Sequence, residues 1–289
     1  MKKLFGRLMA GGRYQRLFGK NKAHALALLV ACCLAVTTAA CGGTAKASGP
    51  QPESGGASSP STNAGAAGTT VYDRIEEQTG WQTCGNCGNT GGSVGATANY
   101  HMDRGVTSPS TDGSSAVFSI SGPGYKNGYW YISHYPAPST PMHYLRYEFD
   151  ILVPQQFANA PEAIEFECQQ SLNGWVYNFA WQGLYHGGVW RTFNYNARQW
   201  ESTGVPFHPF TPGVWHHVVS EFHNDPKTHR TYHDSIAVDG VKYKVPAANV
   251  HQAMHKGSQD YFNSAFQLDL NSKGTPYKVY VDAMKVTFR

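Results

Sequence analysis

Acidic and amide side chains alternate in the segment AIEFECQQ, residues 163–170, and are the first candidates for chemistry. Side chains at positions i and i+2 of a β-strand point to the same face, so Glu165, Glu167 and Gln169 would lie together while the apolar residues between them face a core. Two carboxyl groups on one face could act as a general acid and as a nucleophile or base. They could also accept hydrogen bonds from a ligand that is rich in hydroxyl groups.

A second polar row follows in residues 263–270, where Gln267 and Asp269 alternate with apolar residues. A sheet with one apolar face and one face of carboxylates and amides has one side in the core and the other in water. Because both strands share this pattern, we predict that all five polar side chains project onto one concave sheet face. The alternative, an ordinary solvated outer face, stays open for each strand.

Trp190 and Trp200 are the aromatic candidates for a ligand-binding face, because arginine and asparagine residues surround them in the sequence and indicate exposure. A tryptophan ring can stack on the C–H face of a pyranose while its N–H remains free to donate a hydrogen bond. In residues 174–182 the aromatic side chains share one face of a strand, which indicates a place in the core.

The 13 histidines of the chain do not form a metal-binding motif. His216 and His217 are adjacent on an expected strand and lack the i, i+4 helical spacing of zinc enzymes, so we expect surface or cross-strand roles. Asp282, on the last expected strand, is the one candidate calcium ligand, and no oxygen-rich loop accompanies it. We therefore expect no cofactor, with calcium as a weak alternative.

Cys84 and Cys87 are separated by two residues in a glycine-rich stretch. In an oxidising compartment this spacing favours a disulfide that closes a tight loop, rather than a zinc site or a redox centre. Cys168 has no such neighbour, and we expect it to be buried.

Residues 1–41 have the composition of an export signal: seven Lys and Arg, no acidic residue, and an almost wholly small and apolar stretch at 23–40. Without those seven, 16 Lys and Arg remain against 19 Asp and Glu, a net charge of about −3. The rest of the chain therefore offers no basic surface for nucleic acid. The alternative is an uncleaved membrane anchor, because about 18 apolar residues are near the shortest span of a bilayer.

Cys41 stands in the sequence TAACG, residues 38–42, which resembles a bacterial lipoprotein lipobox apart from Thr38, where the usual residue is Leu. A lipidated Cys41 would tether an exported domain to a membrane. Cleavage nearby and full secretion is the alternative.

Residues 42–70 are mostly Gly, Ser, Ala, Thr and Pro and cannot bury enough apolar surface to offset the entropy of ordering, so we expect a disordered linker. Residues 71–289 alternate short β-branched and aromatic runs with polar residues and turn signals, which predicts one all-β domain, a sandwich of two antiparallel sheets. No amphipathic helix shows the 3.6-residue period, although residues 246–256 could hold a short one. The strands are expected near residues 115–120, 128–134, 144–152, 163–170, 174–182, 187–193, 214–223, 231–238, 241–245, 263–270 and 277–288.

The segment PGVWHHVVSEF, residues 212–222, is followed by TYHDSIAVDGVKYKV, residues 231–245, and the pair is similar to the concanavalin A-like lectin/glucanase superfamily. The resemblance implies a jelly roll of two antiparallel sheets whose concave face binds or cleaves polysaccharide. Segments that resemble one group within it, mostly uncharacterised secreted bacterial proteins, are residues 109–122, 163–170, 174–182 and 275–288.

The glucanase branch of that superfamily carries Glu-x-Asp-x-(x)-Glu on one strand of the cleft. Glu165 and Glu167 match part of this pattern, but Ala163 or Gln169 takes the outer position, and an amide cannot protonate a leaving oxygen. Residues 261–267 are loosely similar to an alginate-lyase segment but lack its Lys and Gly. We therefore expect a polysaccharide-binding domain; a glycoside hydrolase, and after it a polysaccharide lyase or a structural surface protein, are the alternatives.

If Cys41 is lipidated, the protein should sediment with membranes, and Cys41→Ala should move it to the soluble fraction. The reason is that each buried CH₂ of an acyl chain contributes about 0.8 kcal/mol, and stable attachment takes more than one chain. Fractionation of cells that express each form measures this, with Cys33→Ala as the control within the same leader. A Cys41→Ala protein that stays with the membranes would identify the apolar segment as the anchor.

Overall fold

The computed structural model describes residues 63–64, 69–85, 98–135, 137–246, 249–255 and 259–289. These residues form an all-β sandwich, and every strand pairing in it is antiparallel. The predicted fold class, a jelly-roll sandwich of two antiparallel sheets, is confirmed. Over this part of the chain, no helix has the length and apolar character needed to cross a membrane.

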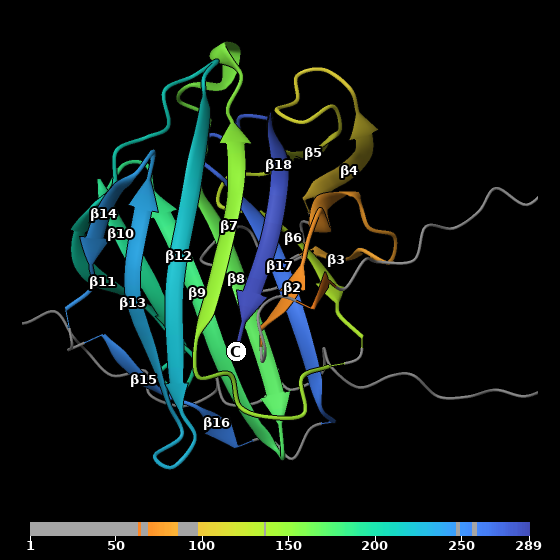
Figure 1. The fold of residues 1–289 in the computed structure, drawn as a ribbon. Helices are drawn as coiled ribbons and strands as arrows, with labels where there is room; N and C mark the ends of the chain where they lie inside the picture. Colours follow the sequence, from red (N-terminus) through yellow and green to blue (C-terminus); the bar gives the residue numbers. More distant parts are fainter. Residues whose placement is uncertain (1–62, 65–68, 86–97, 136, 247–248, 256–258) are drawn as a thin grey trace, which may run out of the picture. The chain divides into compact units, whose positions relative to one another are not determined.

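The first sheet, sheet A, is built around the last strand of the chain, and Figure 1 shows its long strands β12, β7 and β18 side by side. In spatial order it contains β1 (Asn63–Ala64), β2 (Thr70–Tyr72), β18 (Tyr277–Phe288), β7 (Leu145–Leu152), β12 (Trp215–Asp225), β13 (Arg230–Val238) and β14 (Val241–Lys244). In addition, β5 (Ser115–Ser121) pairs with β18, β4 (Asn99–Val106) pairs with β5, and β15 (Val250–Gln252) pairs with β13.

The second sheet, sheet B, carries both polar rows predicted from the sequence. In spatial order it contains β11 (Gln199–Pro206), β10 (Val189–Asn194), β9 (Trp175–Leu184), β8 (Pro161–Leu172), β17 (Tyr261–Leu270), β6 (Asn127–Ser133) and β3 (Gln82–Gly85), with β16 (Met254–His255) beside β9. The helical elements of the described chain are two single 3₁₀ turns, η1 (Ile75–Glu77) and η2 (Gln155–Phe157).

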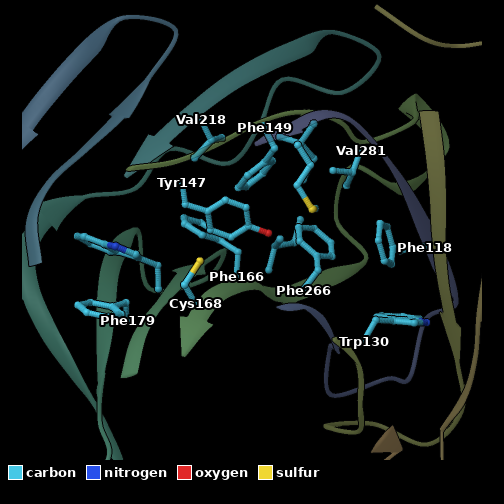
Figure 2. Close-up of a cluster of buried hydrophobic side chains, with 14 of the residues drawn as sticks. Phe118, Trp130, Tyr147, Phe149, Phe166, Cys168, Phe179, Val218, Phe266 and Val281 are labelled. Carbon is cyan, nitrogen blue, oxygen red and sulfur yellow. The ribbon is translucent and has the colours of Figure 1, made fainter. Parts of the chain in front are cut away.

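Aromatic side chains from both sheets fill the space between them (Figure 2). Tyr147 and Phe149 of β7 meet Phe166 of β8, with ring centroids 5.8 and 4.9 Å apart, and Phe266 of β17 lies 5.9 Å from Phe149. Each of these side chains is at most 2% exposed, and burial of such a side chain contributes about 1.5–3 kcal/mol. The predicted apolar faces of these strands are therefore confirmed as core, and Cys168 lies among them as a buried free thiol.

All eleven strands predicted from the sequence are present, and the described residues of 246–256 contain no helix, although the sequence allowed a short one there. That segment instead supplies β15, which pairs with β13, and β16, which pairs with β9. His251 of β15 is 3% exposed, so packing against the sandwich makes this segment a strand. The ladder of β1 with β2 joins Asn63 to Val71 and so begins within the segment for which composition predicts a linker.

The adjacent histidines of β12 form cross-strand contacts with carboxylates, as predicted. The turn after β13 places Asp239 and Gly240 at φ 51° and 81°, the conformation of a tight hairpin. There Asp239 accepts hydrogen bonds from the His217 backbone N–H at 2.8 Å, and its Oδ2 lies 2.7 Å from His216 Nδ1. Among the described residues, no group of three or more His, Cys, Asp or Glu is arranged to hold a metal ion.

His233 lies in the core between Trp181, Phe222 and His251, and burial lowers its pKa well below the usual value. The folded state therefore binds a proton at this site less readily than the unfolded chain does. Stability from this site is complete above about pH 6.5 and is lost as the pH falls, by up to about 1.4 kcal/mol per pH unit. The pKa of His134, lowered by burial to about 3, acts in the same direction.

We expect His233→Gln to show a shallower loss of unfolding free energy between pH 7 and pH 4 than the unchanged protein, because Gln does not titrate. Urea unfolding at several pH values measures the slope. The control is His143→Gln, since His143 is exposed. Equal slopes for all three proteins would contradict an uncharged His233 in the folded state.

Candidate functional site

The five polar side chains predicted to act together share one face of sheet B, the face turned away from sheet A. Gln267 of β17 lies directly opposite Glu165 of β8, which in turn lies opposite Gln182 of β9. Glu167 and Gln169 follow two and four residues further along β8 and therefore point the same way. We call this surface the polar face; the alternating residues of the same strands are the core side chains described above.

Glu165 is the centre of a hydrogen-bond network on the polar face. Its Oε1 accepts a bond of 2.5 Å from Gln182 Nε2, and its Oε2 accepts one of 2.6 Å from Gln267 Nε2. The Gln267 amide nitrogen also donates to Asp269 Oδ1 at 2.9 Å. All four side chains are less than 9% exposed, so their positions are fixed by one another and by the sheet.

The carboxyl groups of Glu165 and Asp269 are both harder to ionise than carboxyls in water. Burial, the Asp269 charge and a hydrogen bond between the two carboxyls raise the pKa of Glu165 well above its usual value. Burial also raises the pKa of Asp269, to about 6, although its bonds with Glu165 and Gln267 oppose this. Two neighbouring carboxyls cannot both ionise readily, so Glu165 keeps its proton to a higher pH than Asp269 does.

Glu167 is held by partners from two other strands. Its Oε1 accepts a hydrogen bond from the Tyr129 hydroxyl of β6, and its Oε2 accepts one of 3.0 Å from Asn178 Nδ2 of β9. Burial raises the pKa of Glu167, while these two bonds act in the opposite direction. Glu167 is more accessible than Glu165, so a ligand could reach this carboxylate from the solvent side.

Half-buried side chains border the network on both sides. Gln169 accepts a hydrogen bond from the Tyr261 hydroxyl of β17. On the other side, Arg191 of β10 lies opposite Gln182, and Phe193 lies opposite Trp200 of β11, with ring centroids 5.1 Å apart. The predicted Trp200 thus belongs to the polar face, together with an arginine and a phenylalanine that the sequence did not single out.

Trp190 is not a ligand-binding residue of this face, so that part of the prediction is wrong. It is 2% exposed and packs in the core against Trp181, with ring centroids 5.9 Å apart. The reason is its position opposite Gly183 of β9, where the missing side chain leaves space. A Cβ at Gly183 would come within 2.8 Å of Phe207 and 3.1 Å of Trp190.

Four further members of the site were not predicted: Tyr129, Asn178, Gln182 and Tyr261. Asn178 and Gln182 occupy the polar phase of GWVYNFAWQ, so the alternation of that strand could have identified them. Tyr129 contacts Glu167 from across β17, and no local sequence pattern links those two residues.

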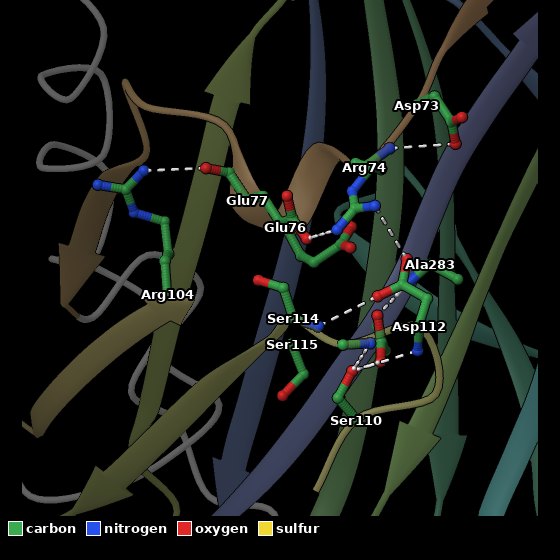
Figure 3. A network of polar contacts seen from close by, with 12 residues as sticks. Asp73, Arg74, Glu76, Glu77, Arg104, Ser110, Asp112, Ser114, Ser115 and Ala283 are labelled. Carbon is green, nitrogen blue, oxygen red and sulfur yellow. Dashed lines mark hydrogen bonds and ion pairs between the residues drawn. The ribbon is translucent and has the colours of Figure 1, made fainter. Parts of the chain in front are cut away.

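A second polar cluster joins the loop after β4 to β18 (Figure 3). Asp282 Oδ2 accepts hydrogen bonds from the Ser110 hydroxyl at 2.8 Å and from the Thr111 backbone N–H at 2.5 Å. Nearby, Glu76 accepts the Met284 N–H at 2.8 Å, and burial raises its pKa to about 8. Asp282, the candidate calcium ligand of the sequence, is thus engaged by protein donors that attach the loop to the last strand.

Of the three cysteines with predicted covalent roles, two lie outside the described residues. These are Cys41 and Cys87, and Cys84 is described only as part of β3. The disulfide and the lipid anchor stay predictions.

No family model matches the sequence, and no curated protein matches it. The fold is similar to several solved structures, all at low identity and with TM-scores below 0.5. An endo-β-1,4-glucuronan lyase from the fungus Trichoderma reesei has 13% identity and a TM-score of 0.44, over 72% of this chain and 94% of that one. A family 11 carbohydrate-binding module from Clostridium thermocellum, in complex with a β-1,3-1,4-mixed-linked tetrasaccharide, has 17% identity and a TM-score of 0.37, over 77% and 96%.

A structure of carbohydrate-binding modules from the β-sandwich superfamily has 11% identity and a TM-score of 0.37. The match covers 73% of this chain but only 58% of that one. These are proteins of the kinds that the sequence resemblance indicates, carbohydrate-binding modules and glycan-cleaving enzymes. At such identities and TM-scores the likeness gives no information about a ligand of this chain.

Asp269→Asn should make the protein more stable than the unchanged chain at pH 7, and the difference should shrink toward pH 4. The folded pKa of about 6 exceeds the unfolded value, so the unchanged protein loses stability as the pH rises from about 4 to 6. Two pH units correspond to about 2–3 kcal/mol. Urea unfolding at pH 4, 5.5 and 7 measures this, with the exposed Asp73→Asn as control. If the variant, compared with the unchanged protein, were less stable at pH 7 than at pH 4, the raised pKa of Asp269 in the folded state would be contradicted.

Proposed function

We propose that the polar face of sheet B binds polysaccharide. The observation that carries this proposal is the ordered set of carboxyl and amide groups around Glu165 and Glu167, placed on one sheet face beside half-buried aromatic side chains. Carboxylate and amide groups pair with sugar hydroxyls, which both donate and accept hydrogen bonds. Aromatic rings such as that of Trp200 offer an apolar surface to the C–H face of a sugar.

The order of the network favours binding. Glu165 and Gln267 are fixed by hydrogen bonds before a ligand arrives, so little side-chain entropy remains to be lost on association. Glu167 and Gln169 keep part of their surface exposed and border the solvent. We propose that these two residues and Trp200 contact the sugar, while the buried members hold them in position.

The proposed location of the protein is outside the cytoplasm, attached to a membrane through Cys41 or an uncleaved leader, or secreted. Residues 42–62, which precede β1, would then act as a tether whose reach is on the order of 25 Å. A domain held in this way would meet polysaccharides of the cell envelope or its surroundings.

A glycan-cleaving enzyme is the second candidate. It is favoured by the closeness of the buried Glu165 and Asp269 carboxyls, which both accept from the Gln267 amide, and by the pKa of Glu165, which burial and the Asp269 charge raise. A carboxyl that keeps its proton at neutral pH can donate it to a glycosidic oxygen as the bond to the sugar carbon breaks. An ionised carboxylate on the same face, such as Glu167, could activate a water molecule or attack that carbon. Both routes are hydrolyses, because water supplies the new hydroxyl group at the sugar carbon and the proton that restores the acid.

The experiment that separates the two candidates is a glycan array followed by an assay for new reducing ends on every glycan that binds. Binding without new reducing ends supports the binding domain. Turnover that is lost in Glu165→Gln, while binding stays within a few-fold, supports the hydrolase. If no glycan binds, both candidates are wrong.

Glu167→Gln should weaken binding of an identified glycan by about 10- to 100-fold, because a hydrogen bond to a charged group contributes about 1.5–3 kcal/mol. Affinity electrophoresis in gels that contain the glycan measures the change. Glu77→Gln is the matched control, because Glu77 lies on η1, pairs with Arg74 and is not part of the polar face. Equal retardation of the two variants would exclude Glu167 from the contact surface.

A further inference from the structure

A cavity of about 630 Å³ opens at the end of the sandwich where β8 begins and β17 ends. Its volume lies within the range of roughly 300–1,000 Å³ that is usual for small-molecule sites. The side chains and backbone that line it come from the connections between strands, at Tyr125, Gln155, Gln156, Ala158, Asn159, Ala160, Glu162, His186, Asn271, Ser272, Lys273 and Thr275.

Two interlocked connections form one wall of the cavity. Gly124, before β6, touches the connection after β17 so closely that a Cβ there would lie 2.1 Å from the carbonyl oxygen of Ser272. Within the second connection, Asn271 Oδ1 accepts the backbone N–H groups of Lys273 and Thr275 at 3.0 and 3.2 Å. Backbone contact and these bonds fix the wall before any ligand binds.

Tyr125 projects from this wall with an exposed ring. Its backbone N–H is 3.2 Å from the carbonyl oxygens of both Leu270 and Asn271, and these bonds hold the residue at φ 59°. A non-glycine residue in the left-handed region costs of order 1 kcal/mol or more, and such strain concentrates at ligand-binding sites. The ring is 44% exposed although most large apolar side chains of the described chain are buried.

The polar groups around the ring have both signs of charge and are open to a ligand. Glu162 Oε2 lies 3.5 Å from His186 Nδ1, and both side chains are solvent-accessible. Lys273 and Gln156 also line the cavity, and within the described part of the chain no ion pair engages the Lys273 ammonium. Because Glu162 and Lys273 carry opposite charges, the cavity favours neither an anion nor a cation, and its donors, acceptors and aromatic ring match a neutral ligand that is rich in hydroxyl groups.

We infer that this cavity is a second carbohydrate site, which takes a mono- or disaccharide unit at the end of a neutral glycan chain and stacks it on Tyr125. The cavity lies among the connections at one end of the sandwich, where the end of a glycan chain can enter, whereas the polar face extends across the strands of sheet B. The inference does not rest on the polar face as a binding site, because none of the cavity-lining residues belongs to the network of Glu165 and Glu167.

The test is a titration of the purified full chain with cellotetraose, mixed-linked β-glucan tetrasaccharide, xylotetraose, mannotetraose and maltotetraose, observed by saturation-transfer NMR. We expect at least one of these probes to bind, and Tyr125→Asn to weaken it about three- to tenfold, the effect of losing one aromatic contact. Asn tolerates the left-handed conformation, so the substitution removes the ring and keeps the backbone.

Tyr135→Asn is the matched control, since Tyr135 is 72% exposed and does not line the cavity. It should leave the affinity unchanged, and Glu167→Gln should leave the Tyr125-dependent part of the binding unchanged. Absence of binding by all five probes at 10 mM, or equal binding by the Tyr125→Asn and Tyr135→Asn proteins, would overturn the inference. Loss of binding in Glu167→Gln alone would instead assign the binding to the polar face.

Discussion

The hydrogen-bonded register between β8 and β17 fixes the position of almost every side chain of the candidate site. In that register Gln267 lies opposite Glu165, while on the other face Phe266 lies opposite Phe166. Since successive side chains alternate, a shift by one residue would exchange the two faces and bring unpaired carboxylates into the core, at a cost of several kcal/mol. The contacts of Phe166 with β7 therefore hold the register, and the register holds the carboxyl network.

The same register places Glu165 and Asp269 where burial acts against their ionisation. A carboxyl whose pKa is raised in the folded protein contributes less to stability at neutral pH than at acid pH. The amide donors of Gln182 and Gln267 offset part of this effect, yet the pair remains harder to ionise than carboxyls in water. Perturbed acidic pairs of this kind are concentrated at functional sites, which is why the network, and not the fold alone, supports the proposed function.

The sequence was sufficient for the strands with strong alternation and for their faces, including the common face of Glu165, Glu167 and Gln267. It failed where a position depends on distant strands. Trp190 stands beside Arg191 in the sequence, but the space opposite Gly183 places it in the core. β4 and β11 were not predicted, because charged residues, Gly and Pro interrupt their alternation.

One strand links the two regions for which carbohydrate roles are proposed. Glu162 at the start of β8 lines the end cavity, and Glu165 three residues later belongs to the polar face. The charge of Glu162 contributes to the raised pKa of Asp269, so the two regions interact electrostatically. A ligand that neutralises or screens Glu162 favours ionisation of Asp269, and by thermodynamic reciprocity ionisation of Asp269 favours that ligand. The coupling acts near the raised pKa of Asp269, about 6, because only there does the ionisation of this carboxyl change with pH.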